Sequence, residues 1–365
     1  MKIALFGGSF NPVHNEHINI VTSALERFDK VIIIPSYLTP DKEGRMTASA
    51  ADRLNMCRLA FGCVPNVEVS DYEIERGGVS YSYITCQEFK KRYPDDELFF
   101  MVGADMFESF HTWKNPEKIL ECVTLAVCGR EKPLGSERPF PCVEIPYTGK
   151  KVSSTRIRAL AALGEDIGGY VPEKAADYIV RNALYKKDLF LSAKKYISAR
   201  RWKHTVGVAV AAAENCARFG VPEEKAITAA ALHDCAKELP ADLLEGFERP
   251  DGVPDAVVHQ YAGAYMAEKH FKVSDADILN AIRYHTSGRE NMSALEKLIL
   301  ISDVVEEGRD YDGVEEIRKA LSENPEKGLL LSFEQQLKHL KETGKTIYPL
   351  TEKALNYLKE NKNDK

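Results

Sequence analysis

Short runs of consecutive apolar residues alternate with amphipathic stretches through the first half of the chain. The clearest runs are residues 3–6, 31–35, 98–103 and 125–128. Unbroken apolar strands between amphipathic segments are typical of a parallel sheet covered by helices, because such strands are buried along their whole length. The pattern predicts an α/β, Rossmann-like domain built on a parallel sheet.

The pattern changes near residue 190. From Ser192 onward helix-like spacing dominates, as in residues 206–218 and 226–233, and no run looks like a strand. The string Lys186-Lys187-Asp188 interrupts the pattern without a Gly/Ser-rich spacer, which favours close packing of two domains. We therefore expect an all-α second domain. The predicted segments are a first domain at 1–187, a second at 192–355 and a charged tail at 356–365.

Composition changes this picture little but excludes some partners. The chain has 365 residues, 44% of them hydrophobic and 28% charged, and a net charge of −6, so it lacks the basic surface of a general nucleic-acid binder. Its eight cysteines form no C-x-x-C pair, which fits free thiols in a reducing cytosol. No run has the length of a membrane span or the pattern of a signal peptide. We expect a cytoplasmic protein without nucleic-acid or membrane partners, and a homo-oligomer stays open.

A glycine turn and two histidines follow the first apolar run. A phosphate beside a turn from strand to helix gains from unpaired backbone N–H groups and from the helix dipole. His14 and His17 lie one helical turn apart, so both can face one phosphate and stabilise charge on it. The alternative is a glycine turn before two surface histidines. The candidate ATP-binding residues here are Gly7, Gly8, Ser9, Phe10, His14 and His17.

A second string of the same half opens another helix with hydroxyl residues. It runs from residue 151 to residue 158, directly before an alanine- and leucine-rich segment. Such a start suits the outer phosphates of ATP, and it equally suits a plain helix cap with exposed arginines. The candidates of this string are Ser153, Ser154, Thr155 and Arg158.

The two strings together resemble the nucleotidyltransferase superfamily, with its signatures (T/H)-x-G-H and S-S-T-x-I-R. The segment Gly103-Ala104-Asp105, followed by Trp113, narrows the resemblance to bacterial nicotinate-nucleotide adenylyltransferases. One departure is that Glu16 stands where the signature has a glycine, although the two histidines keep their spacing. The resemblance covers about residues 1–185. Further matches are residues 170–172, 177–179 and 184–185.

This resemblance implies transfer of the AMP part of ATP to nicotinate mononucleotide, with release of pyrophosphate and with Mg²⁺ as cofactor. It assigns catalysis to His14, His17 and Arg158. Trp113 can stack on the pyridine ring, although a lone tryptophan is more often part of a core. The residues implied for the nicotinate nucleotide are Lys42, Thr85, Gly103, Asp105 and Trp113.

Histidines and aspartates at helix ends carry the chemistry of the second half. His204 opens one helical segment, His233-Asp234 ends an alanine-rich one, and Asp303 lies in a third. Such residues would be costly to bury unpaired, and metal ligation removes that cost. Imidazole and carboxylate ligands suit Fe, Mn, Zn or Co, as one or two ions. A single histidine in a helix is usually an ordinary residue, and we keep that interpretation for His111, His270 and His339.

The order H…HD…D resembles the HD phosphohydrolase superfamily. Residues 281–288 and 302–309 resemble its YqeK-like branch, described as symmetrical diadenosine tetraphosphate hydrolases, although Glu307 replaces the usual proline. The resemblance covers about residues 193–350 and implies hydrolysis of Ap4A to two ADP by a metal-activated water. The implied metal ligands are His204, His233, Asp234 and Asp303, with Asp234 and Lys237 as catalytic residues and His259, His285, Thr286 and Arg309 at a second metal or a substrate phosphate.

The two halves together predict a bifunctional nucleotide enzyme. Its expected partners are ATP, nicotinate mononucleotide and Ap4A or another dinucleoside polyphosphate. One alternative gives the first domain another acceptor, such as nicotinamide mononucleotide or phosphopantetheine. The other makes the second domain a nucleotide-sensing module without hydrolysis. The Gly-Ala-Asp…Trp segment favours a pyridine nucleotide, and the full set of ligands favours hydrolysis.

Overall fold

The structure, a computed structural model, describes residues 1–39, 46–129, 140–149, 152–239 and 244–361. The chain divides into two compact units. The first comprises most of residues 1–158 together with Asp166–Tyr185. The second comprises Ala159–Glu165 and the chain from Lys186 onward.

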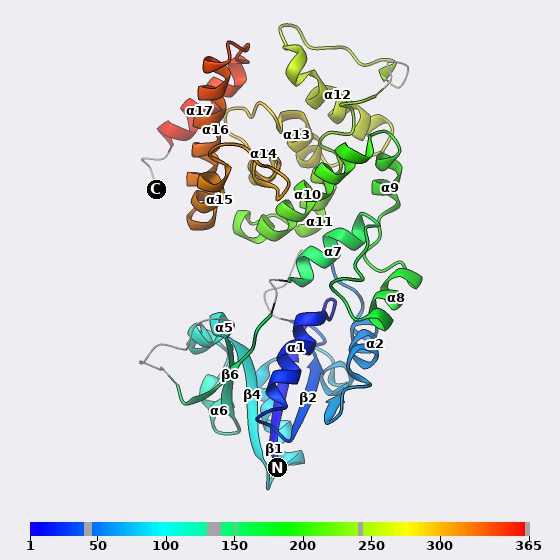
Figure 1. The fold of residues 1–365 in the computed structure, drawn as a ribbon, viewed down its shortest axis with the longest axis vertical. Coiled ribbons are helices and arrows are strands. Elements are labelled where there is room, and N and C mark those ends of the chain that lie inside the picture. The colour runs from blue at the N-terminus through cyan, green and yellow to red at the C-terminus, as the bar shows by residue number, and fades with distance from the viewer. Residues whose placement is uncertain (40–45, 130–139, 150–151, 240–243, 362–365) are drawn as a thin grey trace. The chain divides into compact units, whose positions relative to one another are not determined.

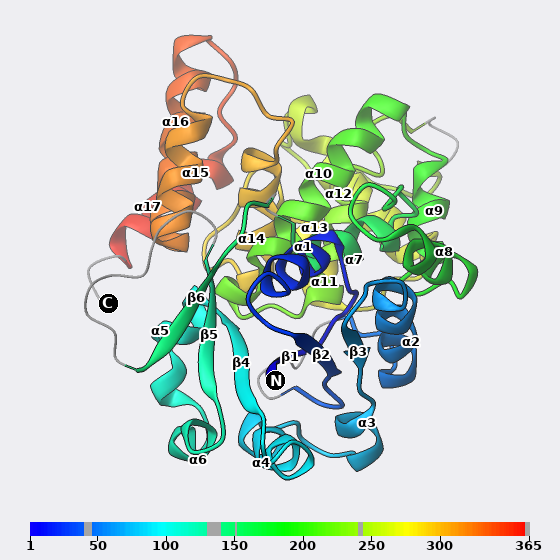
Figure 2. The ribbon, with the colours of Figure 1, turned by 60° about the horizontal axis from the view of Figure 1, so that its bottom comes forward.

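A six-stranded parallel sheet forms the centre of the first unit, in the order β3-β2-β1-β4-β5-β6. Figure 2 shows the strands side by side. The predicted apolar runs form four of them, so the expected α/β, Rossmann-like parallel sheet is confirmed. The strands are β1 (Lys2–Gly8), β2 (Lys30–Pro35), β3 (Val67–Val69), β4 (Glu97–Gly103), β5 (Thr124–Gly129) and β6 (Cys142–Pro146).

Both faces of this sheet are buried, which explains the unbroken apolar runs. In β4, the ring of Phe99 packs against Phe28, with centroids 4.8 Å apart, whereas that of Phe100 meets Trp113 at 6.2 Å. Neighbouring residues of a strand point to opposite faces, so each face of β4 has its own apolar cover. The unit's helices are α1 (Asn15–Ala24), α2 (Ala50–Phe61), α3 (Tyr72–Arg76), α4 (Ser82–Arg92), α5 (Ala104–Glu108), η1 (Phe110–Thr112), α6 (Pro116–Leu120), the start of α7 (Ser154–Ala162) and α8 (Glu173–Arg181).

The strand order reverses at β1, whose two neighbours are β2 and β4. The carboxyl ends of β1 and β4 therefore lie side by side, at Gly8 and Gly103. In open parallel sheets, ligands bind outside the strand ends at such a point of reversal. The fold thus brings the glycine turn and the Gly-Ala-Asp segment to one edge of the sheet.

The second unit is helical, and its described residues form no strand (Figure 1). Helix α14 lies at its centre, packed against α10, α11, α13, α15 and α16. Most of its residues are buried, as its nearly continuous apolar sequence requires. The predicted all-α domain is confirmed. Its helices are α9 (Asp188–Lys194), α10 (Ala199–Asn215), η2 (Cys216–Phe219), α11 (Glu223–Leu232), α12 (Asp255–Lys269), α13 (Ala276–Tyr284), α14 (Ala294–Val305), α15 (Val314–Glu323), α16 (Pro325–Glu342) and α17 (Pro349–Glu360).

The last helix enters the segment predicted as a charged tail. Helix α17 continues to Glu360, and Leu358 packs partly buried against the apolar cluster around Phe333. Residues 356–360 are therefore part of a packed amphipathic helix. Among the described helices, none has the length and apolar character needed to cross a membrane.

Candidate functional site

The turn after β1 is shaped by packing of its own aromatic residue. A Cβ added to Gly8 would lie 3.2 Å from the ring of Phe10, closer than such contacts comfortably allow. Phe10 is 2% exposed and adopts a positive φ of 44°. A glycine at position 8 therefore lets the Phe10 ring fold under the turn, and the following residues then lead into α1.

Arg53 holds this turn from α2. Its Nη1 donates to the carbonyl of Ser9 at 2.7 Å and its Nη2 to the carbonyl of Tyr37 at 2.9 Å. The side chain is buried, and burial lowers the pKa of its guanidinium. Arg53 thus cross-links two loops that follow neighbouring strands, and sequence reasoning missed it because no motif marks its position.

The hydroxyl-rich string at the start of α7 binds the same turn. Arg158 is 2% exposed, and its Nη1 donates to the carbonyl of Asn11 at 2.6 Å while its Nη2 donates to Oγ1 of Thr155 at 3.0 Å. The hydroxyl of Ser154 donates to the carbonyl of Pro12 at 2.9 Å. The structure therefore joins the two predicted strings, with Arg158 and Ser154 directed at the backbone of the turn.

Tyr185 also contacts the turn and was missed as a site residue. Its hydroxyl donates to Oδ1 of Asn11 at 2.7 Å, and the same oxygen accepts the N–H of Ala48 at 3.1 Å. The sequence signal was the Leu184-Tyr185 pair, which the resemblance treats only as the end of the family pattern. In the structure, Tyr185 also helps to fix the turn after β1, although that turn lies at the other end of the unit's sequence.

The two histidines lie together, as their spacing predicts. Their rings are stacked, with centroids 3.7 Å apart and planes inclined by 21°. Nδ1 of His17 accepts the backbone N–H of His14 at 3.1 Å, which places the proton of neutral His17 on Nε2. Nε2 is then a donor for an oxygen of a phosphate. Glu16, at the departure from the signature, is buried and accepts Nδ2 of Asn19 at 3.0 Å.

The residues predicted for the nicotinate nucleotide have different surroundings. Gly103 ends β4, and a Cβ there would lie 2.7 Å from Oδ1 of Asp105, which is exposed. Trp113 is partly buried against Phe110, with ring centroids 5.3 Å apart. Thr85 is 1% exposed and donates its hydroxyl to the buried carboxylate of Glu73, so its side chain is engaged in the interior. The remaining candidate, Lys42, lies outside the described residues.

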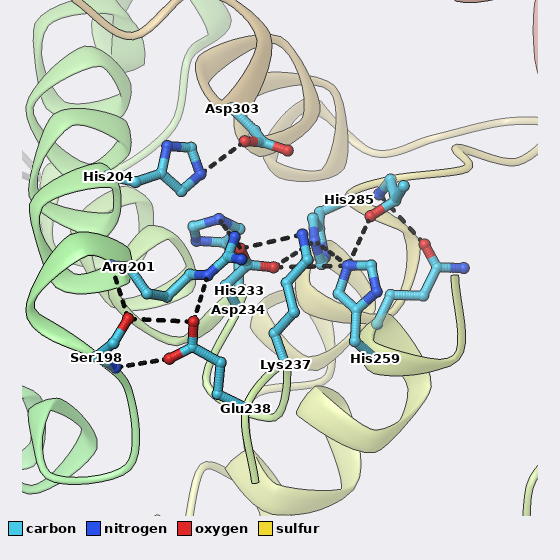
Figure 3. A network of polar contacts seen from close by, with 12 residues as sticks. Ser198, Arg201, His204, His233, Asp234, Lys237, Glu238, His259, His285 and Asp303 are labelled. Carbon is cyan, nitrogen blue, oxygen red and sulfur yellow. Dashed lines mark hydrogen bonds and ion pairs between the residues drawn. The ribbon is translucent and has the colours of Figure 1, made fainter. Parts of the chain in front are cut away.

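In the second unit, α10, α11, α12, α13 and α14 bring the predicted ligands to one place (Figure 3). His204 comes from α10 and Asp303 from α14, with Nε2 and Oδ1 3.0 Å apart. His233 and Asp234 follow α11, His259 lies on α12, and His285 follows α13. Two groups have ligand atoms close enough to hold an ion and share His233. They are His204, His233 and Asp303, and His233, Asp234 and His285.

Two imidazoles of this cluster are oriented by the backbone. Nδ1 of His233 donates to the carbonyl of Ala230, and Nδ1 of His285 donates to that of Ile282, both at 2.7 Å. These bonds leave the Nε2 lone pairs directed at the cluster. Burial lowers the pKa of His233 to about 4, so the imidazole is neutral near pH 7 and can act as a ligand.

Asp234 is surrounded by nitrogen atoms. Its Oδ1 lies 3.4 Å from Nε2 of His285 and 3.5 Å from Nε2 of His259, and its Oδ2 pairs with Arg201 at 2.8 Å and Lys237 at 3.3 Å. Burial alone would raise the pKa of Asp234, but the surrounding imidazoles and Lys237 hold it well below its usual range. The carboxylate of Asp234 therefore stays charged although the residue is only 1% exposed.

The residues predicted for a second ion or a phosphate also lie at the cluster. The hydroxyl of Thr286 lies 3.1 Å from Nε2 of His259, and Nε2 of His259 lies 3.3 Å from that of His285. Arg309 pairs with Asp303 and approaches Nε2 of His204 at 3.5 Å. Burial would raise the pKa of Asp303, but its hydrogen bond from His204 and the nearby charges lower it.

The donor set fits a transition-metal ion. Nε2 of His233 and Oδ1 of Asp234 are buried and have no hydrogen-bond partner among the described residues. Leaving two such atoms unsatisfied in one place is costly, and an ion between them would satisfy both. Imidazole and carboxylate ligands suit Fe, Mn, Zn or Co more than Mg. The structure supports a divalent-metal site.

Sequence reasoning missed one basic and one acidic partner of this cluster, Arg201 and Glu306. Arg201 stands in the basic string before His204, and its Nε lies 3.5 Å from Oε1 of Glu238. Glu306 accepts Nδ1 of His204 at 3.1 Å and is buried. Charged residues three positions from a ligand, on one helix face or just beyond a helix end, were the available signal.

Comparison with known proteins divides the chain in the same way as the two sites do. Residues 5–160 match the Cytidylyltransferase-like family, and residues 201–308 match the HD domain. The two matches contain the stacked histidines and the histidine–aspartate cluster, respectively.

Relatives of this chain carry names for one or both of these parts. A protein of Mycoplasma genitalium, "Probable nicotinate-nucleotide adenylyltransferase/Ap4A hydrolase", is 29% identical over 85% of this chain and 89% of its own length. A "Probable nicotinate-nucleotide adenylyltransferase" of Clostridium tetani is 36% identical over 51% of this chain and 99% of its own length. A solved structure from Clostridium acetobutylicum, a "predicted HD superfamily hydrolase involved in NAD metabolism", is 36% identical, covers 47% of this chain and 96% of its own, and has a TM-score of 0.43.

Proposed function

The chain belongs to the nicotinate-nucleotide adenylyltransferase family in its first half and carries an HD domain in its second, and on this premise we propose two activities. The first unit transfers the adenylyl group of ATP to nicotinate mononucleotide, forming deamido-NAD and pyrophosphate. The second unit hydrolyses Ap4A to two ADP. The family resemblance found in the sequence is confirmed for both halves.

The observation that carries the first proposal is the paired His14 and His17 beside the glycine turn, at the reversal of the strand order. His17 donates Nε2–H to the α-phosphate as the nicotinate nucleotide's phosphate oxygen attacks phosphorus. Bond formation there and cleavage of the bond to pyrophosphate then require no covalent enzyme intermediate. A donor aimed at developing charge commonly contributes about 10²–10³ in rate.

Arg158 and Ser154 serve this reaction through the turn. Their side chains hold the carbonyls of Asn11 and Pro12, so they fix the backbone that faces the phosphates. We therefore propose a positioning role for Arg158 in place of direct contact with a phosphate. Mg²⁺ bound to ATP would neutralise charge on the departing pyrophosphate. Among the described residues of this unit, no group of three metal-ligating side chains comes together to hold it separately.

We propose that the acceptor binds at the end of β4. Asp105 is exposed there and Trp113 presents a partly buried ring, so the segment offers one polar and one aromatic contact. An aromatic ring stacks well on a flat pyridine. This arrangement favours a pyridine nucleotide over phosphopantetheine, which has no aromatic ring to stack.

The observation that carries the second proposal is the pair of unsatisfied buried atoms, Nε2 of His233 and Oδ1 of Asp234. We assign the metal to His204, His233, Asp234 and Asp303, with His259 and His285 at a second ion or at substrate phosphate. A bound ion would lower the pKa of a water and polarise the attacked phosphate. Lys237, Arg309 and Thr286 supply positive charge and a hydroxyl near the same cluster for the polyphosphate.

One substrate screen of the full-length protein tests both proposals. With ATP and Mg²⁺, nicotinate mononucleotide should give deamido-NAD faster than nicotinamide mononucleotide or phosphopantetheine gives its product. After chelation, Fe²⁺ or Mn²⁺ should restore conversion of Ap4A to ADP better than Mg²⁺. Faster use of another acceptor would reassign the first unit. A metal-loaded protein that binds Ap4A but leaves it intact would identify the second unit as a sensing module.

A cytoplasmic location remains part of the proposal. Cys57, Cys86 and Cys235 form no disulfide, and burial raises the pKa of each of these thiols. Buried cysteines that stay outside disulfides fit a reducing compartment. Fractionation of the cells that make it, with a cytosolic marker, would test this location.

A further inference from the structure

His204 is the one imidazole of the described metal-ligating set whose outer nitrogen meets a charged side chain. Nδ1 of His204 lies 3.1 Å from Oε1 of Glu306, while Nε2 faces Asp303. For His233 and His285, the corresponding partners are backbone carbonyls. Metal-binding histidines commonly donate their second N–H to a partner that fixes the ring and raises its basicity, and a carboxylate is the strongest such partner.

The carboxylate of Glu306 is held at both oxygens. Its Oε2 accepts the backbone N–H of Gly308 at 2.6 Å, while Oε1 faces His204. The residue is 5% exposed and begins the loop that follows α14. Its backbone carbonyl accepts Nη2 of Arg318 at 2.7 Å, so the main chain is fixed as well. The position of the carboxylate is therefore determined from several sides.

Two glycines make room for this carboxylate. Gly207 lies three residues after His204, on the same face of α10, and a Cβ at Gly207 would overlap Oε2 of Glu306. A Cβ at Gly308 would lie 3.0 Å from both carboxylate oxygens. A glycine inside a helix costs stability relative to alanine. Space for the carboxylate is a physical reason for Gly207 at that point.

We propose that Glu306 is a positioning residue of the metal site, which holds His204 with Nδ1 protonated and Nε2 directed at the ion. The proposal rests on the metal-dependent function proposed above for this unit. Glu306 acts through His204 and takes no part as a ligand. Since Asp303 and Glu306 lie three residues apart and bind the two nitrogens of one ring, the end of α14 both supplies a ligand and orients another.

Zinc affinity of the full-length metal-free protein tests this role. Glu306→Leu should bind Zn²⁺ about 10–100-fold more weakly than wild type, the usual cost of losing a partner behind a metal ligand. Glu306→Gln should lose less, because its amide oxygen can still accept Nδ1–H. Glu307→Gln is the matched control, since it removes a neighbouring but exposed charge, and should bind like wild type. Equal affinities for wild type and Glu306→Leu would overturn the proposal.

A second variant keeps Glu306 and displaces its carboxylate. Gly207→Ala should weaken Zn²⁺ binding as Glu306→Leu does, and adding it to Glu306→Leu should cause little further loss, because both changes remove one contact. Independent, additive losses would contradict the proposal.

Proton NMR of the zinc-loaded protein separates positioning from a merely structural role. Wild type should show a protected downfield N–H signal from Nδ1 of His204, which should be absent in Glu306→Leu. Persistence of that signal at unchanged position in Glu306→Leu would exclude Glu306 as its acceptor. If wild type binds no Zn²⁺, Mn²⁺ or Fe²⁺, the metal-dependent function proposed for this unit fails. If wild type binds metal and its Glu306 variants bind it equally well, only the positioning role of Glu306 fails.

Discussion

Nη1 of Arg201 lies 2.8 Å from Oδ2 of Asp234, a carboxylate that is 1% exposed in the centre of the histidine cluster. The other oxygen, Oδ1, faces His259 and His285. A buried carboxylate needs a countercharge, and breaking a buried ion pair from one side leaves an uncompensated charge. Arg201, with Lys237, supplies that countercharge on one side of Asp234, and the ligand nitrogens occupy the other.

Removal of Asp234 should therefore silence the second unit alone. We expect Asp234→Ala to lose metal and to hydrolyse Ap4A more than about 100-fold more slowly. Loss of a metal ligand should reduce metal affinity and activity at least as much as loss of a residue that only hydrogen-bonds to a ligand. Metal analysis and ADP release measure both effects, and circular dichroism checks the fold. Asp255→Ala, an exposed helix-end aspartate, is the control. Hydrolysis that survives in the metal-free variant would reject a metal mechanism.

The same Asp234→Ala protein should keep its Mg²⁺-dependent adenylyl transfer. The stacked histidines belong to the other unit and share no described residue with the cluster. Deamido-NAD formation should stay within about twofold of wild type, since sites that share no residues or partners are usually energetically independent. Loss of both activities in a folded protein would show that the two sites are coupled.

His17 should be required for adenylyl transfer. We expect His17→Ala to lower kcat by about 10²–10³, the usual cost of one charge-stabilising donor. His17→Asn is the informative partner, because its Oδ1 can accept the N–H of His14 as Nδ1 does while the outward N–H is lost. Both variants should be equally slow. His270→Ala, an exposed histidine of the second unit, should be unaffected. Near wild-type rates in His17→Asn would mean that His17 only caps α1.

The Gly-Ala-Asp segment should govern the acceptor more than ATP. Asp105→Ala and Trp113→Leu should each raise KM for nicotinate mononucleotide by about tenfold, the effect of losing roughly 1.4 kcal/mol of binding. KM for ATP should change less than twofold. Steady-state kinetics with each substrate varied in turn gives both values. A rise confined to the KM for ATP would show that the two pockets are assigned in reverse.

Arg53 should stabilise the first unit through the turn. Arg53→Met removes the hydrogen bonds from the charged guanidinium to the carbonyls of Ser9 and Tyr37, and hydrogen bonds to charged groups contribute about 1.5–3 kcal/mol each. We expect a lower midpoint of urea unfolding for this unit and slower adenylyl transfer. Arg58→Met, an exposed arginine of the same helix, is the control. Equal midpoints for both variants would show that Arg53 contributes no more than a surface residue.

Glu73 should make the first unit less stable as the pH rises. Burial raises the pKa of Glu73, although the hydroxyls of Thr85 and Ser80 oppose the shift. The folded state thus holds this proton more tightly, so the contribution of Glu73 is present below the ordinary carboxyl pKa and is lost as pH rises through the folded value. Glu73→Gln should therefore gain stability over wild type with increasing pH. Melting temperatures from pH 4 to 8 measure it, and a constant difference would contradict it.

The sheet and the two motif-bearing turns could be predicted because their signals are local. Apolar runs, glycines after a strand, and His14 with His17 one turn apart each express a constraint within a few residues. The H…HD…D order can likewise be recognised in the sequence without knowledge of the fold. Burial of residues 98–102 on both faces explains why β4 was visible as an unbroken run.

The remaining features depend on pairs that are far apart in the chain. Arg53 reaches Ser9, Tyr185 reaches Asn11, and Glu306 reaches His204, and none of these pairs has a periodicity to reveal it. Thr85 was predicted from its place in the family pattern, and only the fold shows that its hydroxyl donates to the buried carboxylate of Glu73. Spacing identifies which residues can do chemistry, but only tertiary contacts show which residues hold them in place.

The hydrogen bond from Tyr185 to Asn11 has a consequence for synthesis of the chain. A ribosome releases Asn11 early and Tyr185 only after nearly the whole first unit, and Ser154 and Arg158 also emerge late. The nascent turn therefore exists during most of the synthesis of the first unit without three of its anchors. A fragment that ends between residues 158 and 185 carries both signature strings but lacks the contact from Tyr185 to Asn11, so such a truncated product should bind ATP poorly even with every signature residue present.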